Sequence, residues 1–259
     1  MKALVLVAAT AAMAQSIPEF VHGEECLFCH RNDIGSAWQK NRHNNTTRRK
    51  DGGEEFVLGA GAHTRRLKKA GYQRLAIWDD KTQSWDGAKF GERCAGCHTT
   101  AVDPKDLTYA YTGLDCFTCH GTVDLQHSGN TQLVLLSKKR RGDVALVNSI
   151  CSQCHLRGAK SKATGRPYPN AYVAGSSLFD DFQADLKLAD QADLNPGDRH
   201  VYRSVRDGIA CLGCHAVHAN SNTKHRRVLN SPVCQDCHFE GRPRKEVRKY
   251  EVSSALCEY

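Results

Sequence analysis

A five-residue pattern, Cys-x-x-Cys-His, occurs six times along the chain and constrains its folding more than any other feature. The six motifs, numbered in chain order, lie at residues 26–30, 94–98, 116–120, 151–155, 211–215 and 234–238. They use twelve of the thirteen cysteines. The fold of such a chain must therefore accommodate the groups that the six motifs bind.

Three kinds of chemistry use closely spaced cysteines: disulfides, zinc sites and covalent haem. Disulfides are common in exported proteins and zinc is held by Cys and His, but neither requires His directly after the second Cys. The chain has 13 His among 259 residues, so six such placements by chance are improbable. Haem c attachment requires this spacing, because two thiols bond the two porphyrin vinyl groups and the adjacent His binds the iron. We therefore expect six covalently bound haem c groups, with zinc and disulfides as the alternatives.

Each motif would supply two thioether cysteines and one proximal histidine. The cysteines are Cys26, Cys29, Cys94, Cys97, Cys116, Cys119, Cys151, Cys154, Cys211, Cys214, Cys234 and Cys237. The proximal histidines are His30, His98, His120, His155, His215 and His238. The thirteenth cysteine, Cys257, has three open interpretations: an intermolecular disulfide, a contact with a haem, or a free thiol.

The second axial ligand decides whether an iron keeps an open coordination position. Methionine is excluded in the exported chain, because the only methionines are Met1 and Met13. Seven histidines outside the motifs are candidate distal ligands, against the alternative of surface or hydrogen-bonding residues: His22, His43, His63, His127, His200, His218 and His225. Only six are needed, so the sequence predicts mostly bis-histidine haems. His218 follows His215 by three residues, about 10 Å when extended, so it would serve a different haem.

The N-terminal residues predict export. Lys2, the apolar run Ala3–Ala12 and the small residues around Met13 are typical of a secretory signal peptide over residues 1–14; the alternative is a buried N-terminal helix. No later apolar run is long enough to span a membrane. We expect a protein without a membrane span, located in the periplasm, at the cell surface or outside the cell.

The predicted fold is mainly α-helical with extensive coil and little β structure, organised around closely packed haems in residues 15–259. A mean hydropathy of −0.54 and 7% aromatic residues leave little material for an ordinary core, so the haem-free chain is expected to be largely unfolded. A division near residue 140 would give halves 15–140 and 141–259. Short helices are predicted at Ser36–Arg42, Asp143–Ser152 and Pro196–Val205, the last capped by Asn195.

Two further sequence features concern haem packing. Glycine stands three positions before the first Cys of four motifs, at Gly23, Gly91, Gly113 and Gly208. It would permit a tight turn or a close approach to a porphyrin, although loop glycines falling there by chance are the alternative. The interval 44–90 lacks a motif, and we interpret it as an excursion that brings His63, with Trp78 or Trp85, onto a haem.

The formal net charge of +8 does not imply nucleic acid as a partner. An exported chain does not meet that partner, and the propionates of six haems would balance most of the positive charge. Basic clusters such as residues 48–50 and 65–69 remain open to two interpretations: a docking site for an acidic redox protein, or a solvated face.

Three motif regions resemble a known family. The runs CFTCHGTVDLQH, CSQCHLRG and CLGCHAVH resemble the CxxCHG…H, CxxCHxRG and CxxCHxxH elements of multihaem c-type cytochromes related to the tetrahaem electron shuttle of ammonia oxidisers. The resemblance covers most of residues 22–240. It implies that His127, His218 and His43, which follows a Trp in AWQKNRH, are distal ligands.

Two functions remain open from the sequence. The first is electron transfer through six low-potential haems between a redox donor and an acceptor, as in anaerobic respiration, or along a self-assembled extracellular conductor. The second is an oxidoreductase acting on a nitrogen or sulfur oxyanion at one five-coordinate haem. Nitrite reductases of this broad group often replace the motif His by Lys, and no CxxCK occurs here. We expect an electron carrier rather than an enzyme, with no catalytic residues assigned.

Overall fold

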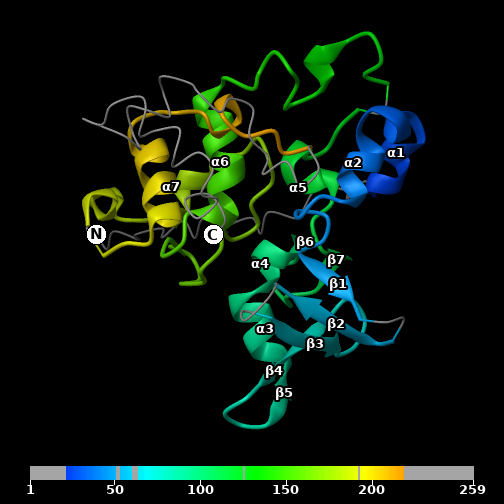
Figure 1. Ribbon diagram of the computed structural model, residues 1–259, viewed down its shortest axis with the longest axis vertical. Helices are drawn as coiled ribbons and strands as arrows, with labels where there is room; N and C mark the ends of the chain where they lie inside the picture. Colours follow the sequence, from blue (N-terminus) through cyan, green and yellow to red (C-terminus); the bar gives the residue numbers. More distant parts are fainter. Residues whose placement is uncertain (1–21, 51–52, 60–63, 125, 192, 219–259) are drawn as a thin grey trace, which may run out of the picture.

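The computed structural model describes residues 22–218, except 51–52, 60–63, 125 and 192 (Figure 1). The predicted signal peptide, His63, His225, the sixth motif and Cys257 lie outside the described residues. In the part of the chain that is described, no helix has the length and apolar character needed to cross a membrane.

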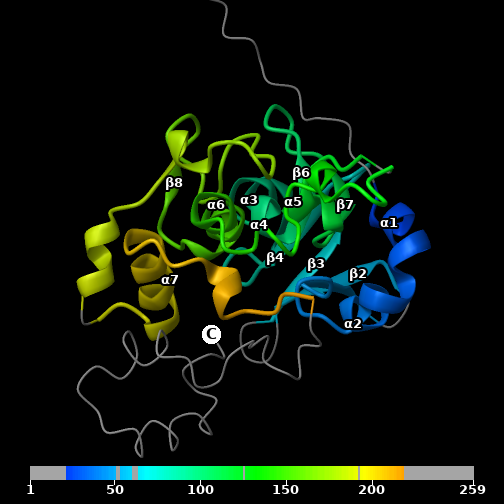
Figure 2. The same cartoon turned by 90° about the horizontal axis from the view of Figure 1, so that it is seen from above.

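Most helices are short, and several coincide with the motifs. In chain order they are α1 (Gly23–His30), the π-helix η1 (Arg31–Gly35), α2 (Ser36–Gln39), α3 (Gly87–Arg93), α4 (Ala95–His98), α5 (Cys116–His120), η3 (Thr131–Leu133), α6 (Val144–His155), η4 (Leu178–Asp180), η5 (Leu186–Asp190), α7 (Pro196–Arg206) and η6 (Cys211–Gly213). α6 lies between α7 on one side and α4 and α5 on the other, as Figures 1 and 2 both show.

A helix is present at each of the three predicted places, although α2 ends at Gln39 rather than Arg42 and has no side-chain cap at its start. α6 begins after Asp143, whose Oδ1 accepts a hydrogen bond from Leu146 N at 3.1 Å. α7 begins at Pro196, and the side chain of Asn195 accepts from Gly197 N at 2.8 Å. These caps satisfy backbone N–H groups that have no partner within the helix.

The prediction of a mainly helical fold with little β structure is wrong. The chain forms one five-stranded antiparallel sheet in the order β1 (Thr47–Arg49), β2 (Glu55–Leu58), β3 (Arg65–Lys69), β4 (Leu75–Asp79) and β5 (Ser84–Asp86). Two-stranded sheets are formed by β6 (Thr99–Val102) with β7 (Tyr109–Thr112), and by β8 (Lys160–Ser161) with β9 (Phe182–Gln183).

The strands were not predicted because they are short, and because β1 and β3 contain few apolar residues. β3 reads RRLKK, with Leu67 as its single apolar residue, and every strand in the described residues has five residues or fewer. A strand of this kind is stabilised by its neighbours in the sheet rather than by its own composition. The interval 44–90, interpreted as an excursion, contains the five strands of this sheet.

One face of the five-stranded sheet forms a hydrophobic core with α3 and α4. Leu67 is fully buried there, beside Ile77 and Phe90, and Cys94 of the second motif packs against the same cluster. Trp78 and Trp85 pair across β4 and β5, and Trp78 alternates with the core residue Ile77, so the two indoles occupy the opposite face. They do not pack beside the second motif.

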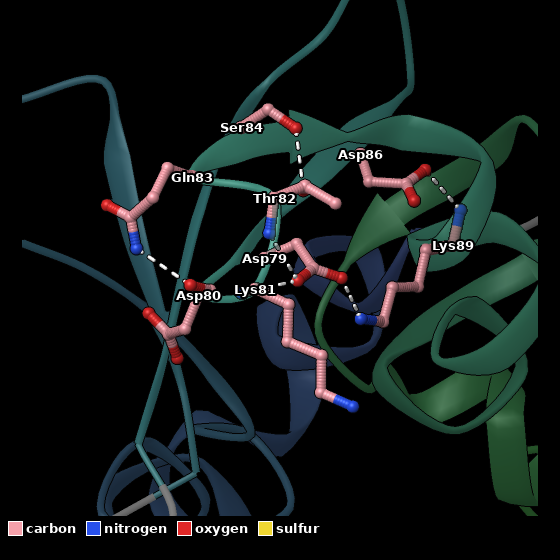
Figure 3. A network of polar contacts seen from close by, with 8 residues as sticks. All are labelled: Asp79, Asp80, Lys81, Thr82, Gln83, Ser84, Asp86 and Lys89. Atoms are coloured by element: carbon pink, nitrogen blue, oxygen red, sulfur yellow. Dashed lines mark hydrogen bonds and ion pairs between the residues drawn. The ribbon is translucent and has the colours of Figure 1, made fainter.

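The β4–β5 hairpin is tied to α3 by a polar network (Figure 3). Asp79 bonds Lys89 Nζ, and its Oδ1 accepts from the backbone N–H groups of Lys81 and Thr82 at 2.8 and 3.3 Å. These donors, Lys89 first, hold the pKa of Asp79 at about 2. Asp86 caps α3 through Lys89 N at 2.8 Å. Since α3 leads directly into Cys94, the sheet fixes the entry to the second motif.

Candidate haem-binding centre

Three of the five motifs in the described residues have a helical conformation suited to binding a planar group. Motifs one, three and four lie on helical turns of α1, α5 and α6. On a helix, residues three and four positions apart share one face. The two cysteines and the histidine of each of these motifs therefore face the same side, as attachment of one porphyrin requires.

The described cysteines are chemically available for thioether formation. The ten described cysteines are not joined in disulfides, so the disulfide alternative gains no support from the described residues. No group of three or more His, Cys, Asp or Glu in the described residues has a metal-holding arrangement, so zinc gains no support there either. Burial raises the pKa of Cys94 and of Cys119 to about 11.

Cysteines of different motifs approach one another closely. Side-chain hydrogen bonds join Cys26 to Cys116, Cys97 to Cys154, and Cys151 to Cys211. The bond from Cys116 lowers the pKa of the Cys26 thiol to about 7. Motif four, at the end of α6, thus contacts motifs two and five, and Gln153 Nε2 also reaches Thr118 O of motif three at 3.2 Å.

The structure brings motif histidines and non-motif histidines together in pairs. The ring-centre distances are 5.9 Å for His30 and His127, 6.0 Å for His120 and His218, 6.1 Å for His43 and His155, and 6.2 Å for His200 and His215. In every pair one ring belongs to a motif and the other does not. His218 lies opposite a histidine of motif three rather than opposite His215 of its own motif.

These distances fit two imidazoles on opposite sides of one iron. With each ring nitrogen about 2 Å from a metal, the ring centres of trans ligands are roughly 6 Å apart. The ring centres of ordinary aromatic pairs also lie about 4.5–7 Å apart. Ordinary pairs, however, would not join one histidine of a motif to one histidine outside the motifs in every case. The interplanar angles range from 7° to 74°, whereas the distances stay within 0.3 Å of each other. The distance is therefore the constrained quantity.

Burial favours the neutral form of three motif histidines, which is the form that binds a metal. It lowers the pKa of His98 and of His120 to about 4, and it lowers the pKa of His155. Nδ1 of His98 is buried without a hydrogen-bond partner. A ring that loses its hydration without a partner is costly in a haem-free chain, so these positions favour a bound group.

Among the described residues, which do not include His63, no histidine ring lies opposite His98. His22 lies edge-on to Tyr111 at 5.0 Å, and its Nδ1 accepts from Glu24 N at 3.1 Å. The assignments of His22, His63 and His225 as distal ligands stay predictions.

Glycines before two motifs have distinct structural reasons. Gly113 has φ +99°, a conformation that side chains disfavour, so it makes the turn into motif three. Gly23 N donates to Asp115 Oδ2 at 3.1 Å, and a Cβ on Gly23 would lie 2.5 Å from Asp115 Oδ1. Asp115 directly precedes Cys116, so this contact joins motif one to motif three.

Sequence reasoning missed two buried polar side chains that join motifs. Asn148 on α6 accepts from Cys211 N at 3.3 Å through Oδ1, and its Nδ2 donates to Ile209 O at 3.0 Å. Gln153, inside motif four, joins Thr118 as described above. Both residues are uncharged and polar, and both lie on the face of α6 that is buried. Because buried polar groups need hydrogen-bond partners, a polar residue at such a position is the sequence signal that could have identified them.

The second motif packs against a tyrosine from a distant segment. Tyr168, 3% exposed, donates from its hydroxyl to Gly91 O at 2.5 Å, and its ring lies against Gly96. Tyr168 thereby joins the segment after α6 to the second motif.

This contact predicts a pH dependence. Burial raises the pKa of Tyr168 to about 12, above the value of about 10 expected in an unfolded chain, so the folded protein holds this proton more tightly. The stability that the folded protein gains from this tighter proton binding is complete below pH 10 and is lost as the pH rises through 12. We expect Tyr168→Phe to remove this part of the alkaline destabilisation in denaturant titrations at pH 9–12. A Phe variant with the wild-type alkaline profile would contradict the assignment.

Comparison with known proteins agrees with this site. Residues 87–167 match the family model described as cytochrome c3. This segment holds motifs two, three and four. The match supports a multihaem c-type cytochrome with covalently bound haem c.

Other comparisons add less. A similar solved structure is the undecahaem cytochrome from the S-layer of Carboxydothermus ferrireducens, with 18% sequence identity and a TM-score of 0.43. The alignment covers 89% of this chain and 44% of that cytochrome, so the chain spans less than half of its length. No curated protein matches the chain.

Proposed function

We propose that the protein is an exported electron-transfer cytochrome with six haem c groups, mostly or entirely bis-histidine coordinated. The observation that carries the proposal is the set of four histidine pairs, each joining one motif histidine to one outside the motifs at about the spacing of trans ligands on one iron. The haems supply reversible one-electron chemistry when bound.

The residues of the chain have three tasks in this function. The motif cysteines would hold the groups covalently, and the paired histidines would bind the irons from both sides, leaving no coordination position for a substrate at those irons. The contacts between motifs one and three, and between motif four and motifs two, three and five, bring neighbouring attachment sites together. Electrons would then pass between adjacent groups without leaving the protein.

The partners follow from this role. An exported carrier receives electrons from one redox protein and gives them to another, and self-assembly into an extracellular conductor is a further version of the same proposal. The basic clusters at residues 48–50 and 65–69 lie on β1 and β3 of one sheet. Arg66 is engaged there with Glu55 at 3.1 Å and with the rings of Trp78 and Trp85, which favours a structural role for this arginine.

Low-temperature EPR of the fully oxidised holoprotein, with haem quantified on the same sample, tests the proposal. We expect six haems per chain and only low-spin ferric signals, because two histidines per iron give a strong ligand field. Fewer than six haems would contradict the assignment of the motifs. A stoichiometric high-spin signal would identify an open iron and favour the oxidoreductase, with nitrite, hydroxylamine and sulfur oxyanions as substrates to test.

A further inference from the structure

Asn41 is a completely buried amide between two of the histidine pairs. Its exposed fraction is 0%. It follows α2 and lies beside the end of the described chain, where residues 211–218 approach α2 in both Figure 1 and Figure 2. Burying a polar side chain is costly unless its hydrogen bonds are made, so the contacts of this amide show what it does.

The oxygen of the Asn41 side chain faces His43. Oδ1 accepts from His43 N at 2.8 Å and lies 3.2 Å from His43 Nδ1. Since Oδ1 is only an acceptor, the ring nitrogen must carry the proton and donate. The proton on Nδ1 leaves Nε2 of His43 as the nitrogen with a lone pair for an iron.

The nitrogen of the same amide faces the segment that carries His218. Nδ2 donates to Val217 O at 2.6 Å. This bond also fixes the orientation of the amide: exchanging O and N would place two acceptors against each other at Val217 and two donors against each other at His43. Trp38, whose carbonyl accepts from Asn41 N at 2.9 Å, lies edge-on to the ring of His218 at 6.4 Å.

We propose that Asn41 is a positioning residue for two axial histidines at once, His43 directly and His218 through Val217. His43 lies opposite His155 of motif four, and His218 lies opposite His120 of motif three. One side chain thus sets the ring orientation at two neighbouring haem sites and the basicity of the ligand at one of them. The inference rests on the proposed haem coordination. It adds a way of tuning the basicity of a ligand that the identity of the ligands alone does not provide.

The electronic effect has a defined sign. A hydrogen bond from the distant ring nitrogen of a ligating histidine makes the ligand more basic, and a more basic ligand stabilises the ferric state. Asn41→Asp keeps the acceptor for His43 and gives it a negative charge, so the reduction potential of one haem should fall. Asn41→Ala removes the acceptor, so the potential of that haem should rise.

The matched control is Asn45→Ala. Asn45 supports the same loop, because its Nδ2 donates to Gln39 O at 2.9 Å and to Asn41 O at 2.7 Å, but neither of these bonds involves a histidine. A purely structural role for this loop would make Asn45→Ala and Asn41→Ala behave alike.

The experiment is a spectroelectrochemical titration of the purified holoproteins, with EPR of their oxidised forms. We expect opposite shifts of one haem in Asn41→Asp and Asn41→Ala, a changed low-spin signal from a second haem in both because the bond to Val217 is lost, and wild-type behaviour in Asn45→Ala. Shifts of the same sign, or titrations equal to the control, would overturn the proposal. Should Asn41→Ala not assemble, a downward shift in Asn41→Asp supports the inference and its absence overturns it. Failure of the proposed function itself would already appear in the wild-type spectrum.

Discussion

Replacing Cys151 and Cys154 with serine will lower the yield of folded holoprotein several-fold more than replacing Cys26 and Cys29. The first pair removes haem attachment at motif four, and the second removes it at motif one. Both changes are the same chemically, so a difference between them reports the position of each motif in the fold.

Motif four is central. It ends α6, which contacts α4, α5, α7 and η6, and most residues of α6 from Leu146 to Gln153 are buried. Losing the porphyrin at this site would leave an unfilled volume against several helices at once, and cavities of this kind destabilise in proportion to their size. A loss of a few kcal/mol is enough to change the abundance of a marginally stable protein several-fold.

Motif one lies at the edge. Within α1 only Gly23 is buried, Phe28 is 90% exposed and Cys29 is exposed. We therefore expect the variant of motif one to accumulate as a protein with five haems, recognisable by mass and by haem content per chain. Equal yields of the two variants, or a greater loss for motif one, would show that α6 is not the centre around which the chain folds.

Helices α6 and α7 were predictable from local signals, whereas the sheet was not. Asn195 and Pro196, like Asp143, are start signals that act within a few residues and can be read directly. The strands β1–β5 depend on pairing with the neighbouring strands of the sheet, as in the register of Leu67 with Ile77. Nothing in RRLKK indicates that partner, because the neighbouring strand supplies the hydrogen bonds and the core.

The candidate site likewise has features that the sequence predicts and features that it does not. The sequence supplies the motifs and the number of spare histidines, since both are properties of residue type and spacing. It does not supply the pairing of His43 with His155, which are 112 positions apart, nor the placement of Asn41 between two histidine segments. Such contacts depend on the path of the whole chain, and a buried asparagine has no local signature that separates it from a loop residue.

Gly96→Ala will destabilise the holoprotein, whereas Gly213→Ala at the same motif position will not. Gly96 and Gly213 are the third residues of CAGCH and CLGCH. A Cβ on Gly96 would lie 2.2 Å from Cγ of Tyr168, but a Cβ on Gly213 would meet no atom of the described residues within 4 Å. Tyr168 is buried and held by its bond to Gly91 O, so its ring cannot move aside freely.

The two substitutions are expected to change the free energy of unfolding in different directions. Overpacking of a tight core contact costs about 1–3 kcal/mol, so the denaturation midpoint of Gly96→Ala should fall. Replacing a glycine by alanine where space and backbone permit stabilises by about 0.4–1 kcal/mol, because the unfolded chain loses freedom, so Gly213→Ala should be neutral or slightly stabilised. Chemical denaturation followed by haem absorbance and far-UV circular dichroism measures both.

A second substitution separates the clash from other effects at Gly96. Tyr168→Leu removes the ring, so Gly96→Ala should cost much less in the Tyr168→Leu background than in the wild type, giving a coupling that a double-mutant cycle measures directly. Additive effects would mean that the alanine acts through the motif backbone rather than through Tyr168. In that case the packing of residues 168–174 on the second motif would not depend on the contact between Gly96 and the Tyr168 ring. The alkaline destabilisation assigned to Tyr168 would then be the remaining test of how tightly residues 168–174 are held.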